Sequence, residues 1–201
     1  MESIKMRRKI GEDYESYNEY VEHQKVKTTD PKRRKKWLGG EWQQKITIFK
    51  RTFNYFKDEN ILKENMKCLC FGARTGQEVV ALNEIGMEAI GIDIVPEEPY
   101  VIEGDIHNVP FDDESFDFVF TNIVDHSIYP EKFMNEIERV LKSGGNALIH
   151  LQLNCKSDEY AENDIYNSKS VIKLFKDSKV VIDRKIPNTL GMNWEFLMKK
   201  N

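Results

Sequence analysis

Hydrophobic positions along the chain change their spacing near residue 65. Before that point they recur every three or four residues, the interval that places side chains on one face of a helix. We therefore expect two amphipathic helices in this part of the chain, the second of them long. One stripe contains Tyr14, Tyr17, Tyr20 and Val21, and the other contains Trp42, Ile46, Phe49, Phe53 and Phe56.

Between the two stripes lies a basic segment, residues 31–36, followed by Trp37-Leu38-Gly39-Gly40. Charge runs of this kind are most often solvated surface. We therefore expect a solvated connector, with an electrostatic dock for an acidic substrate or a nucleic acid as the alternative.

From residue 66 onward, short apolar runs alternate with segments of helical spacing. This alternation favours an α/β fold with a mostly parallel sheet and helices on both faces. We expect one compact domain, in which residues 66–201 form the core and residues 1–65 form a helical cap. The predicted strands are 67–71, 88–94, 100–102, 116–121, 146–153, 179–183 and 193–198, and the predicted helices are 77–85, a segment from Pro130 to Ser143-Gly144-Gly145, and 168–176.

The ends of the first two predicted strands carry the pattern of a ligand site. In such sheets, ligands bind beyond the carboxyl ends of the strands, where the strand order reverses. The first strand leads into Gly72-Ala73-Arg74-Thr75-Gly76, and Gly72 lets the backbone turn sharply and approach a ligand. Asp93 ends the second strand, where a carboxylate can accept hydrogen bonds from ribose hydroxyls. A tight turn and a helix cap are the alternatives.

Composition narrows the class of partner and compartment. The 30 Lys and Arg residues and 34 Asp and Glu residues give a formal net charge of −4, so we expect no general attraction to nucleic acid or anionic membrane. We find no run of about 18 apolar residues and no signal-peptide core, which predicts a cytoplasmic protein without a membrane span. Cys68, Cys70 and Cys155 suit a reducing compartment. Cys68 and Cys70 should share a buried face of one strand.

Several linked blocks resemble the class I S-adenosylmethionine (SAM)-dependent methyltransferases, especially the methyltransferase-11 branch. The blocks are Gly72–Gly76, Gly91-Ile92-Asp93, residues 104–117 and residues 138–145. The resemblance covers roughly residues 66–153. It implies a Rossmann-like, seven-stranded, mostly parallel sheet, with SAM as cofactor and S-adenosylhomocysteine (SAH) as product. The run from Gly72 through Asp125-His126 and Tyr129-Pro130 is also similar to methyltransferase domains of plants and large algal viruses, some of which sit beside sugar-transferring domains.

The resemblance also implies roles for residues at the strand ends. The matching positions are Gly72, Ala73, Arg74, Thr75 and Gly76 beside the methionine half of SAM, Asp93 and Ile94 beside the ribose, Asp105 and Ile106 beside the adenine, and Thr121 and Asn122 beside the methionine again.

Two positions depart from the pattern of the superfamily. It usually has an acidic residue at position 70 and a glycine at position 74, where this chain has Cys70 and Arg74. The missing acid removes one expected partner for the methionine amino group. We expect the guanidinium fork of Arg74 to pair with the methionine carboxylate. Solvent and an acidic substrate are the alternative directions for this side chain.

Transfer of a methyl group to a hydroxyl also needs a group that removes the proton. Asp125 and His126 follow the fourth strand, and His150 lies in or at the end of the fifth. We expect His126 to be the base, assisted by Asp125; His150 is a second candidate, for which a structural role is favoured. Structural hydrogen bonding is the alternative for each histidine. A divalent metal at Asp125-His126 is conceivable, but we see no full set of ligands.

The acceptor is the least constrained part of the prediction. The residues after the fourth strand, Thr121-Asn122-Ile123-Val124, lack the Asn/Asp-Pro-Pro-aromatic run that grips exocyclic amino groups of bases, and no proline precedes a cysteine. We therefore expect O-methylation of a carbohydrate or another small molecule, with Tyr14, Tyr17 and Trp37 as candidates for stacking on a sugar. An RNA methyltransferase and a non-catalytic SAM-binding module are the alternatives.

Overall fold

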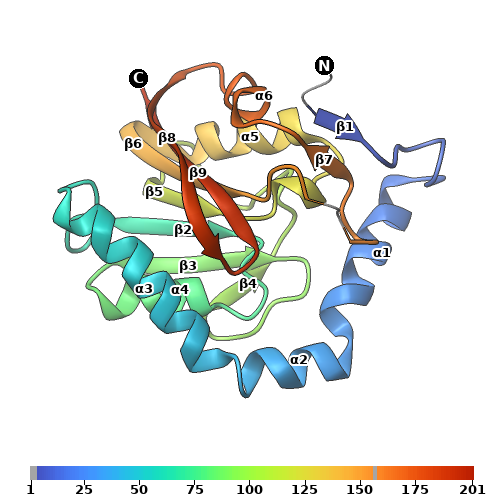
Figure 1. The fold of residues 1–201 in the computed structure, drawn as a ribbon, viewed down its shortest axis with the longest axis horizontal. Coiled ribbons are helices and arrows are strands. Elements are labelled where there is room, and N and C mark those ends of the chain that lie inside the picture. The colour runs from blue at the N-terminus through green and yellow to red at the C-terminus, as the bar shows by residue number, and fades with distance from the viewer. Residues whose placement is uncertain (1–3, 156–157) are drawn as a thin grey trace.

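A seven-stranded sheet runs through the centre of the molecule in the order β4-β3-β2-β5-β6-β9-β8, as Figure 1 shows. The structure is a computed structural model that describes residues 4–155 and 158–201. The strands of this sheet are β2 (Lys67–Phe71), β3 (Glu88–Asp93), β4 (Val101–Glu103), β5 (Phe116–Thr121), β6 (Leu141–Leu151), β8 (Ser178–Thr189) and β9 (Met192–Lys200).

Five neighbouring strands, from β4 to β6, are parallel, and β9 is antiparallel to both β6 and β8. The predicted seven-stranded, mostly parallel sheet is therefore confirmed. The chain passes from β2 outward to β3 and β4 and then returns to the other side of β2 at β5. This reversal creates the crevice in which such sheets bind ligands.

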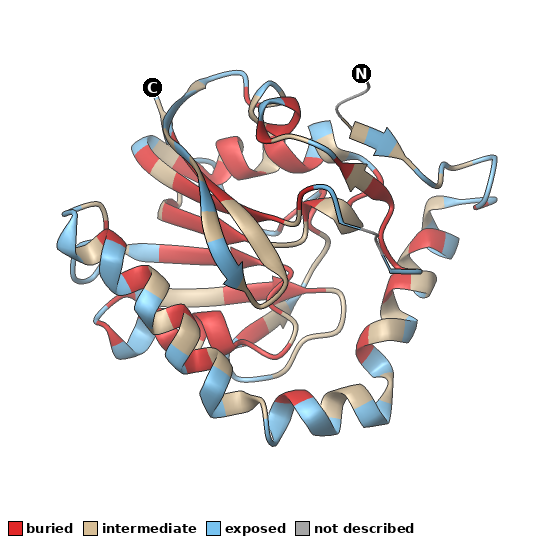
Figure 2. Cartoon of the chain, viewed as in Figure 1, coloured by how far each residue is buried: buried red, intermediate tan, exposed pale blue. Residues whose placement is uncertain are grey.

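Alternating residues of each central strand point to two separate cores. In β2, Cys68 and Cys70 face α3 (Trp42–Asp58) and α4 (Gln77–Glu84), whereas Leu69 and Phe71 face the other core. That second core includes residues of α5 (Pro130–Val140) and α6 (Ser168–Ile172). Figure 2 shows buried residues concentrated in the central strands, whereas the β8–β9 hairpin is largely half-buried or exposed. Both predicted features, helices on two faces and a shared face for the two cysteines, are present.

Helix α3 is part of the hydrophobic core. Its stripe of Ile46, Phe49, Phe53 and Phe56 is buried, as the helical spacing predicts. The ring of Phe53 meets those of Phe118 and Phe120 edge-on, both at 89°. Edge-to-face pairs of this kind add to the stability that burial of the rings provides.

Shortening Ile46 to valine should lower the free energy of unfolding by about 0.5–1.5 kcal/mol, because it removes one buried methylene equivalent from the core. Ile46 is only 1% exposed. Urea unfolding followed by circular dichroism measures the change. Val26→Ala is the control, because Val26 lies on the surface of α1 and its truncation should stay within about 0.5 kcal/mol. Equal losses in the two variants would contradict this packing of α3.

The N-terminal elements form an arc that faces the carboxyl ends of the central strands (Figure 1). They are α1 (Tyr17–Thr29) and α2 (Pro31–Leu38). The basic segment is thus a helix that joins α1 to α3, and its six residues are exposed or half-buried, as expected of a solvated connector. Asp30 caps α2 by accepting a hydrogen bond from the backbone N–H of Arg33, and Pro31 occupies the first turn, where a missing N–H costs nothing.

Other boundaries also differ from the prediction. The glycines 144 and 145 lie within β6, which begins directly after α5 instead of after a glycine stop. Strand β8 continues beyond residue 183 to Thr189, and α6 ends at Ile172. A small antiparallel pair, β1 (Ile4–Met6) with β7 (Asn163–Ile165), was not predicted. Among the described residues, none of the helices combines the length and apolar character needed to cross a bilayer.

Candidate active site

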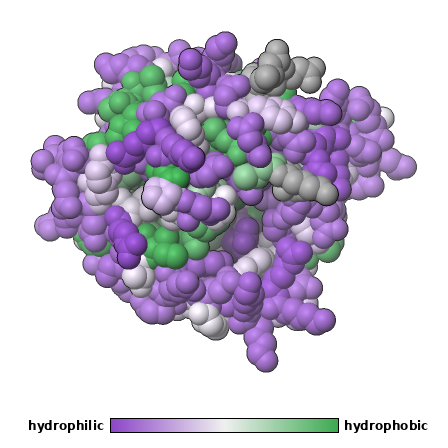
Figure 3. All heavy atoms as spheres, viewed as in Figure 1, coloured by the Kyte–Doolittle hydropathy of each residue, from purple (hydrophilic) through white to green (hydrophobic). Residues whose placement is uncertain are grey.

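Two adjoining pockets open beyond the carboxyl ends of β2, β3 and β5, where the strand order reverses. The first lies against α1, with Tyr17 and Asp105 in its walls, and is called the α1 pocket here. The second extends toward α2 and α3, with Trp37 and Asn122 in its walls, and is called the α3 pocket. Figure 3 shows a recess on this face, bordered largely by hydrophilic residues. The residues that line both pockets are Lys27, Gly72, Arg74, Ile123 and His126.

The turn after β2 takes a conformation that favours glycine at two positions. Gly72 and Gly76 have φ angles of +69° and +83°, which residues with a side chain rarely adopt. A Cβ atom on Gly76 would also lie 2.8 Å from the Cβ of Tyr100. Gly76 does not line either pocket. It shapes the turn and begins α4, while Gly72, Ala73 and Thr75 form part of the pocket walls.

Arg74 occupies the left-handed region as well, with a φ angle of +50°. This conformation aims its backbone N–H at Asp93, whose Oδ2 accepts the hydrogen bond at 3.0 Å. The guanidinium carbon lies 4.4 Å from the centre of the Trp37 ring. Among the described residues, the guanidinium group has no hydrogen-bond or ion-pair partner. Its N–H donors are therefore available to a ligand in either pocket.

Asp93 closes the turn and faces the α1 pocket. Its Oδ1 accepts the backbone N–H of Val95 at 2.9 Å, and its Oδ2 accepts that of Arg74. Burial raises the pKa of this carboxyl, although the two backbone hydrogen bonds and the charge of Arg74 oppose the rise. Ile94 follows Asp93 in the wall of the same pocket.

Asp105 and Ile106 form the far wall of the α1 pocket. Asp105 accepts a hydrogen bond from the Tyr17 hydroxyl at 2.7 Å and one from the backbone N–H of His107 at 2.8 Å. Burial alone would raise the pKa of Asp105, but its hydrogen bonds from His107 and Tyr17 lower it to about 2. The carboxylate is therefore ionised at any physiological pH. His107 is buried, and its Nε2 lies 2.7 Å from Ser127 Oγ.

The two predicted residues at the end of β5 have different surroundings. Thr121 is fully buried, and its hydroxyl donates to the carbonyl of Phe71 across the neighbouring strand at 3.3 Å. It does not line either pocket. Asn122 lines the α3 pocket. Thr121 thus joins two strands, and Asn122 is the residue of this pair that a ligand can reach.

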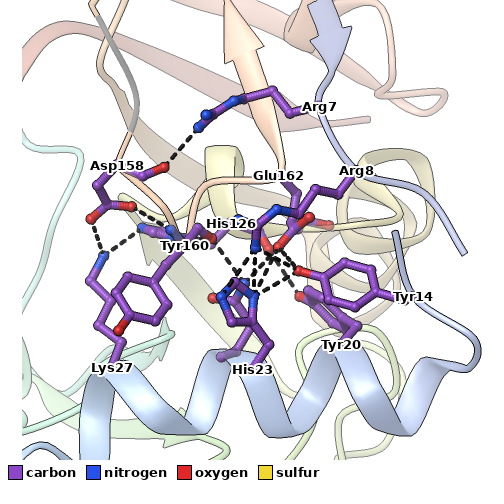
Figure 4. Close-up of polar contacts among 12 residues, drawn as sticks. Arg7, Arg8, Tyr14, Tyr20, His23, Lys27, His126, Asp158, Tyr160 and Glu162 are labelled. Atoms are coloured by element: carbon purple, nitrogen blue, oxygen red, sulfur yellow. Dashed lines mark hydrogen bonds and ion pairs between the residues drawn. The ribbon is translucent and has the colours of Figure 1, made fainter. Parts of the chain in front are cut away.

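His126 lies where the two pockets meet, at the end of η1 (Val124–His126). Its Nδ1 is 2.9 Å from the Tyr160 carbonyl oxygen, which can only accept. In the neutral ring, Nδ1 therefore carries the hydrogen and Nε2 presents a lone pair. Lys27 Nζ lies 3.3 Å from that Nε2, and Asp125 Oδ2 lies 3.8 Å from it. Figure 4 shows Lys27 and His126 beside one another.

Lys27 comes from α1 and joins this helix to the segment after β6. Its ammonium group donates to Asp158 Oδ2 at 2.8 Å. Burial lowers the pKa of Lys27, with the charge of Arg74 acting in the same direction and Asp158 acting against it. Nothing in the local sequence marks Lys27 as a site residue, because its partners lie about a hundred residues or more away along the chain.

A buried polar cluster holds α1 in place next to this site (Figure 4). The Glu162 side chain is fully buried and accepts hydrogen bonds from the Tyr14 hydroxyl at 2.7 Å and the Gln24 amide at 2.8 Å. Burial raises the pKa of Glu162. Tyr14 is thus part of the interior, and the Trp37 ring is covered by Arg74. Tyr14 therefore offers no open ring face to a sugar, whereas Tyr17 borders the α1 pocket and Trp37 lines the α3 pocket beside Arg74.

His150 lies away from both pockets, within the sheet. It is 2% exposed, and its Nε2 is 3.3 Å from Glu195 Oε2 on the paired strand β9. Its ring also meets that of Phe120 edge-on, with centroids 5.1 Å apart. Arg184 Nε donates to Glu195 at 2.7 Å. These contacts favour the structural alternative for His150.

Glu78 was missed in the sequence analysis, although it lines the α3 pocket. Burial raises its pKa to about 7. A recognisable signal was present, since Glu78 is an acidic residue in the first turn of the helix that follows the glycine turn. In residues 4–155 and 158–201, no three His, Cys, Asp or Glu side chains come together as a metal-binding group.

Comparisons with known proteins agree with this geometry. A family model described as a methyltransferase domain matches residues 69–149. Sterol 4-C-methyltransferase strm-1 of Caenorhabditis elegans is 26% identical over 128 residues, which cover 55% of this chain and 37% of that protein. The chain thus spans little more than a third of the length of this curated relative.

Solved structures share the fold over most of the chain. The 1,6-didemethyltoxoflavin N1-methyltransferase of Burkholderia thailandensis, with bound 1,6-didemethyltoxoflavin and SAH, has a TM-score of 0.67 and 13% identity, covering 92% of this chain and 91% of that one. The [4+2]-cyclase SpnF has a TM-score of 0.60 and 13% identity, covering 75% and 80%. At such low identity, the likeness establishes the fold alone.

Proposed function

We propose that the chain is a SAM-dependent methyltransferase, a proposal that the methyltransferase-domain match over residues 69–149 supports, and that it methylates a hydroxyl group of a carbohydrate or another small molecule. The observation that carries the proposal is the position of His126. Its Nε2 lone pair lies where the two pockets meet, beside the glycine turn. A base at this point can act on an acceptor that approaches the cofactor from the α3 pocket.

The residues around the α1 pocket fit the adenosine half of SAM. Each carboxylate oxygen has more than one lone pair, so Asp93 can accept ribose hydroxyls while keeping its bonds to Arg74 and Val95. The ionised Asp105 can accept the adenine amino hydrogens in the same way, and Ile106 offers an apolar surface to the purine ring. The methionine half would then extend past Gly72 toward Arg74.

The chain's own residues supply alignment, closure and proton removal. SAM, when bound, supplies a methyl group on a positively charged sulfur. Helix α1 covers the α1 pocket, and the Lys27–Asp158 ion pair holds it to the segment after β6. This cover keeps water from the reacting groups. As the acceptor oxygen becomes an ether oxygen, His126 Nε2 takes its proton, while Nδ1–H stays on the Tyr160 carbonyl. Lys27 then donates to Asp158 alone.

The polar walls of the α3 pocket support a hydroxyl-rich acceptor. Asn122, Gln152 and Asp158 line it beside apolar side chains such as Phe49 and Met192. A sugar can exchange hydrogen bonds with the polar groups while its C–H faces lie against the apolar ones. The curated relative is named for a sterol acceptor, so sterols belong in any test of the acceptor.

A screen with SAM carrying a radiolabelled methyl group tests this function directly. Sugars, sugar nucleotides, phenols, sterols and RNA are offered in parallel, and we expect label in a hydroxyl compound of the sugar or phenol class. Label in RNA alone would make the chain an RNA methyltransferase. No transfer to any acceptor, together with SAH binding in calorimetry, would favour a non-catalytic SAM-binding module.

A further inference from the structure

We propose that Glu78 binds the α-ammonium group of SAM and, with Arg74, forms a two-charge clamp for the amino acid end of the cofactor. The inference rests on the proposed function, because it concerns the same pocket. Its basis is a pair of opposite charges that face the α3 pocket, each without a hydrogen bond or ion pair to another side chain among the described residues.

Glu78 is placed where a carboxylate is costly unless a ligand compensates it. It lies in the first turn of α4 and is 6% exposed. Carboxylates with this degree of burial are normally paired or hydrogen-bonded. In the described part of the chain, the Glu78 carboxylate accepts a hydrogen bond from its own backbone, but no other side chain donates to it. An arriving cation would therefore gain more here than at a solvated carboxylate.

The titratable groups around Glu78 come from four parts of the fold. Arg74 in the glycine turn and Lys45 on α3 lower its pKa, whereas Asp93 at the end of β3 raises it. Cys70 on β2 also lies close enough to interact with it electrostatically. Burial outweighs the two cations, so that the carboxyl is poised between its neutral and charged forms. Arg74 and Lys45 therefore do not fully offset the cost of burying the ionised Glu78 carboxylate.

Arg74 supplies the opposite charge at the same pocket. Trp37 supports one face of the guanidinium plane, which leaves the N–H donors at its edge free. An α-amino acid carries an ammonium and a carboxylate on one carbon. Such a ligand can satisfy Glu78 and Arg74 together, whereas a simple amine or a simple acid would satisfy only one of them.

Comparing two ligands tests the assignment. SAH carries the amino acid end, and 5′-methylthioadenosine has the same adenosine without it. Glu78→Gln should weaken SAH binding by about 10- to 100-fold, the range for loss of a hydrogen bond to a charged group, and leave 5′-methylthioadenosine within about twofold. Glu84→Gln, at the exposed end of the same helix, is the control and should change neither affinity.

The outcomes of this calorimetry are distinguishable. If Glu78→Gln weakens both ligands equally, or weakens neither, Glu78 has no role toward the ammonium, and its position in the first helical turn serves α4 alone. If the unaltered protein binds neither ligand, the proposed function itself fails.

The pH dependence gives a second, independent readout. With a pKa of about 7, Glu78 is mostly neutral at pH 6 and mostly ionised at pH 7.5. The apparent dissociation constant for SAH should therefore rise by about eightfold between pH 7.5 and pH 6, because only the ionised fraction is competent to bind. The Glu78→Gln variant and 5′-methylthioadenosine should both show a flat profile. A slope that survives in Glu78→Gln would overturn the assignment.

In the ligand-free protein, the charge on Glu78 should lower the stability of the folded state. The folded pKa of Glu78 is above its ordinary value of 4.5, so the native state loses stability as the pH rises from about 4.5 through about 7. Glu78→Gln should therefore raise the melting temperature at pH 8 by several degrees and change it little at pH 5. A lower melting temperature at pH 8 would show that ionised Glu78 is already compensated.

Discussion

Replacing Asp93 with asparagine should weaken the binding of SAH and of 5′-methylthioadenosine alike, on the order of 100-fold, because hydrogen bonds to a charged carboxylate contribute about 1.5–3 kcal/mol each. Both ligands carry the ribose that Asp93 is proposed to hold. The carboxylate faces the α1 pocket, while the backbone N–H groups of Arg74 and Val95 fix its orientation. Asparagine keeps the shape and one acceptor oxygen but loses the charge.

Isothermal titration calorimetry with the two ligands measures this effect. Asp58→Asn, an exposed position at the end of α3, is the control and should bind both ligands as the unaltered protein does. The fold should survive in Asp93→Asn, which a circular dichroism melt checks. SAH binding within a factor of three of the unaltered protein would remove Asp93 from the ribose site. Loss of SAH binding alone would move it to the amino acid end, where we place Glu78.

The ribose and ammonium assignments therefore make opposite predictions for one ligand. An Asp93 variant should lose affinity for 5′-methylthioadenosine, and a Glu78 variant should keep it. General damage to the glycine turn would lower both affinities in both variants. The pair of substitutions thus separates two contacts that lie on the same cleft.

The turn and its acidic partner could be predicted because they depend on local backbone requirements. Gly72 and Gly76 take φ angles that few other residues adopt, and Asp93 sits where the second parallel strand ends. Strand ends follow from the alternation of apolar residues, and parallel strands bring their carboxyl ends to one edge. For this reason, most of the predicted cofactor residues line one of the two pockets.

The contribution of the N-terminal region could not be predicted in the same way. Lys27 reaches His126 across 99 positions of sequence, and Tyr17 reaches Asp105 across 88. Contacts of this range depend on how α1 lies over the sheet, which the helical stripe alone does not specify. The helical stripe also gave no sign that Gln24 and Thr28, both polar, are buried on α1. Both line the α1 pocket, and Gln24 also donates to the buried Glu162.

The helical form of the basic segment and the surroundings of His150 have different physical causes. Asp30 and Pro31 are a helix start signal, and residues 31–36 form a helix whose charged side chains keep it at the surface. His150 follows the alternation of β6, which places its side chain on the face covered by α3, among Phe120 and Glu195. A residue near the end of a strand reaches the cleft only if its side chain also lies on the face of the sheet that borders the cleft.

Replacing His126 with asparagine should lower kcat for methyl transfer to a hydroxyl by about 10²- to 10⁴-fold, the range for loss of a general base. Asparagine is the informative choice because its side-chain N–H can still donate to the Tyr160 carbonyl, as Nδ1 of His126 does at 2.9 Å. What it lacks is a basic nitrogen at the Nε2 position, which Lys27 faces. The variant therefore keeps the structural contact and removes the base.

Single-turnover assays with the acceptor found by the radiolabel screen measure the rate, and calorimetry with SAH checks that the cofactor still binds within about threefold. His126→Ala adds the loss of the Tyr160 contact, so it should be no faster than His126→Asn and should also weaken the attachment of the segment after β6. If His126→Asn keeps the full rate while His126→Ala loses it, the histidine orders that segment, and the proton leaves through another group. Lys27 would then be the next candidate, since its ammonium group lies at the same junction of the two pockets, 3.3 Å from His126 and 2.8 Å from Asp158.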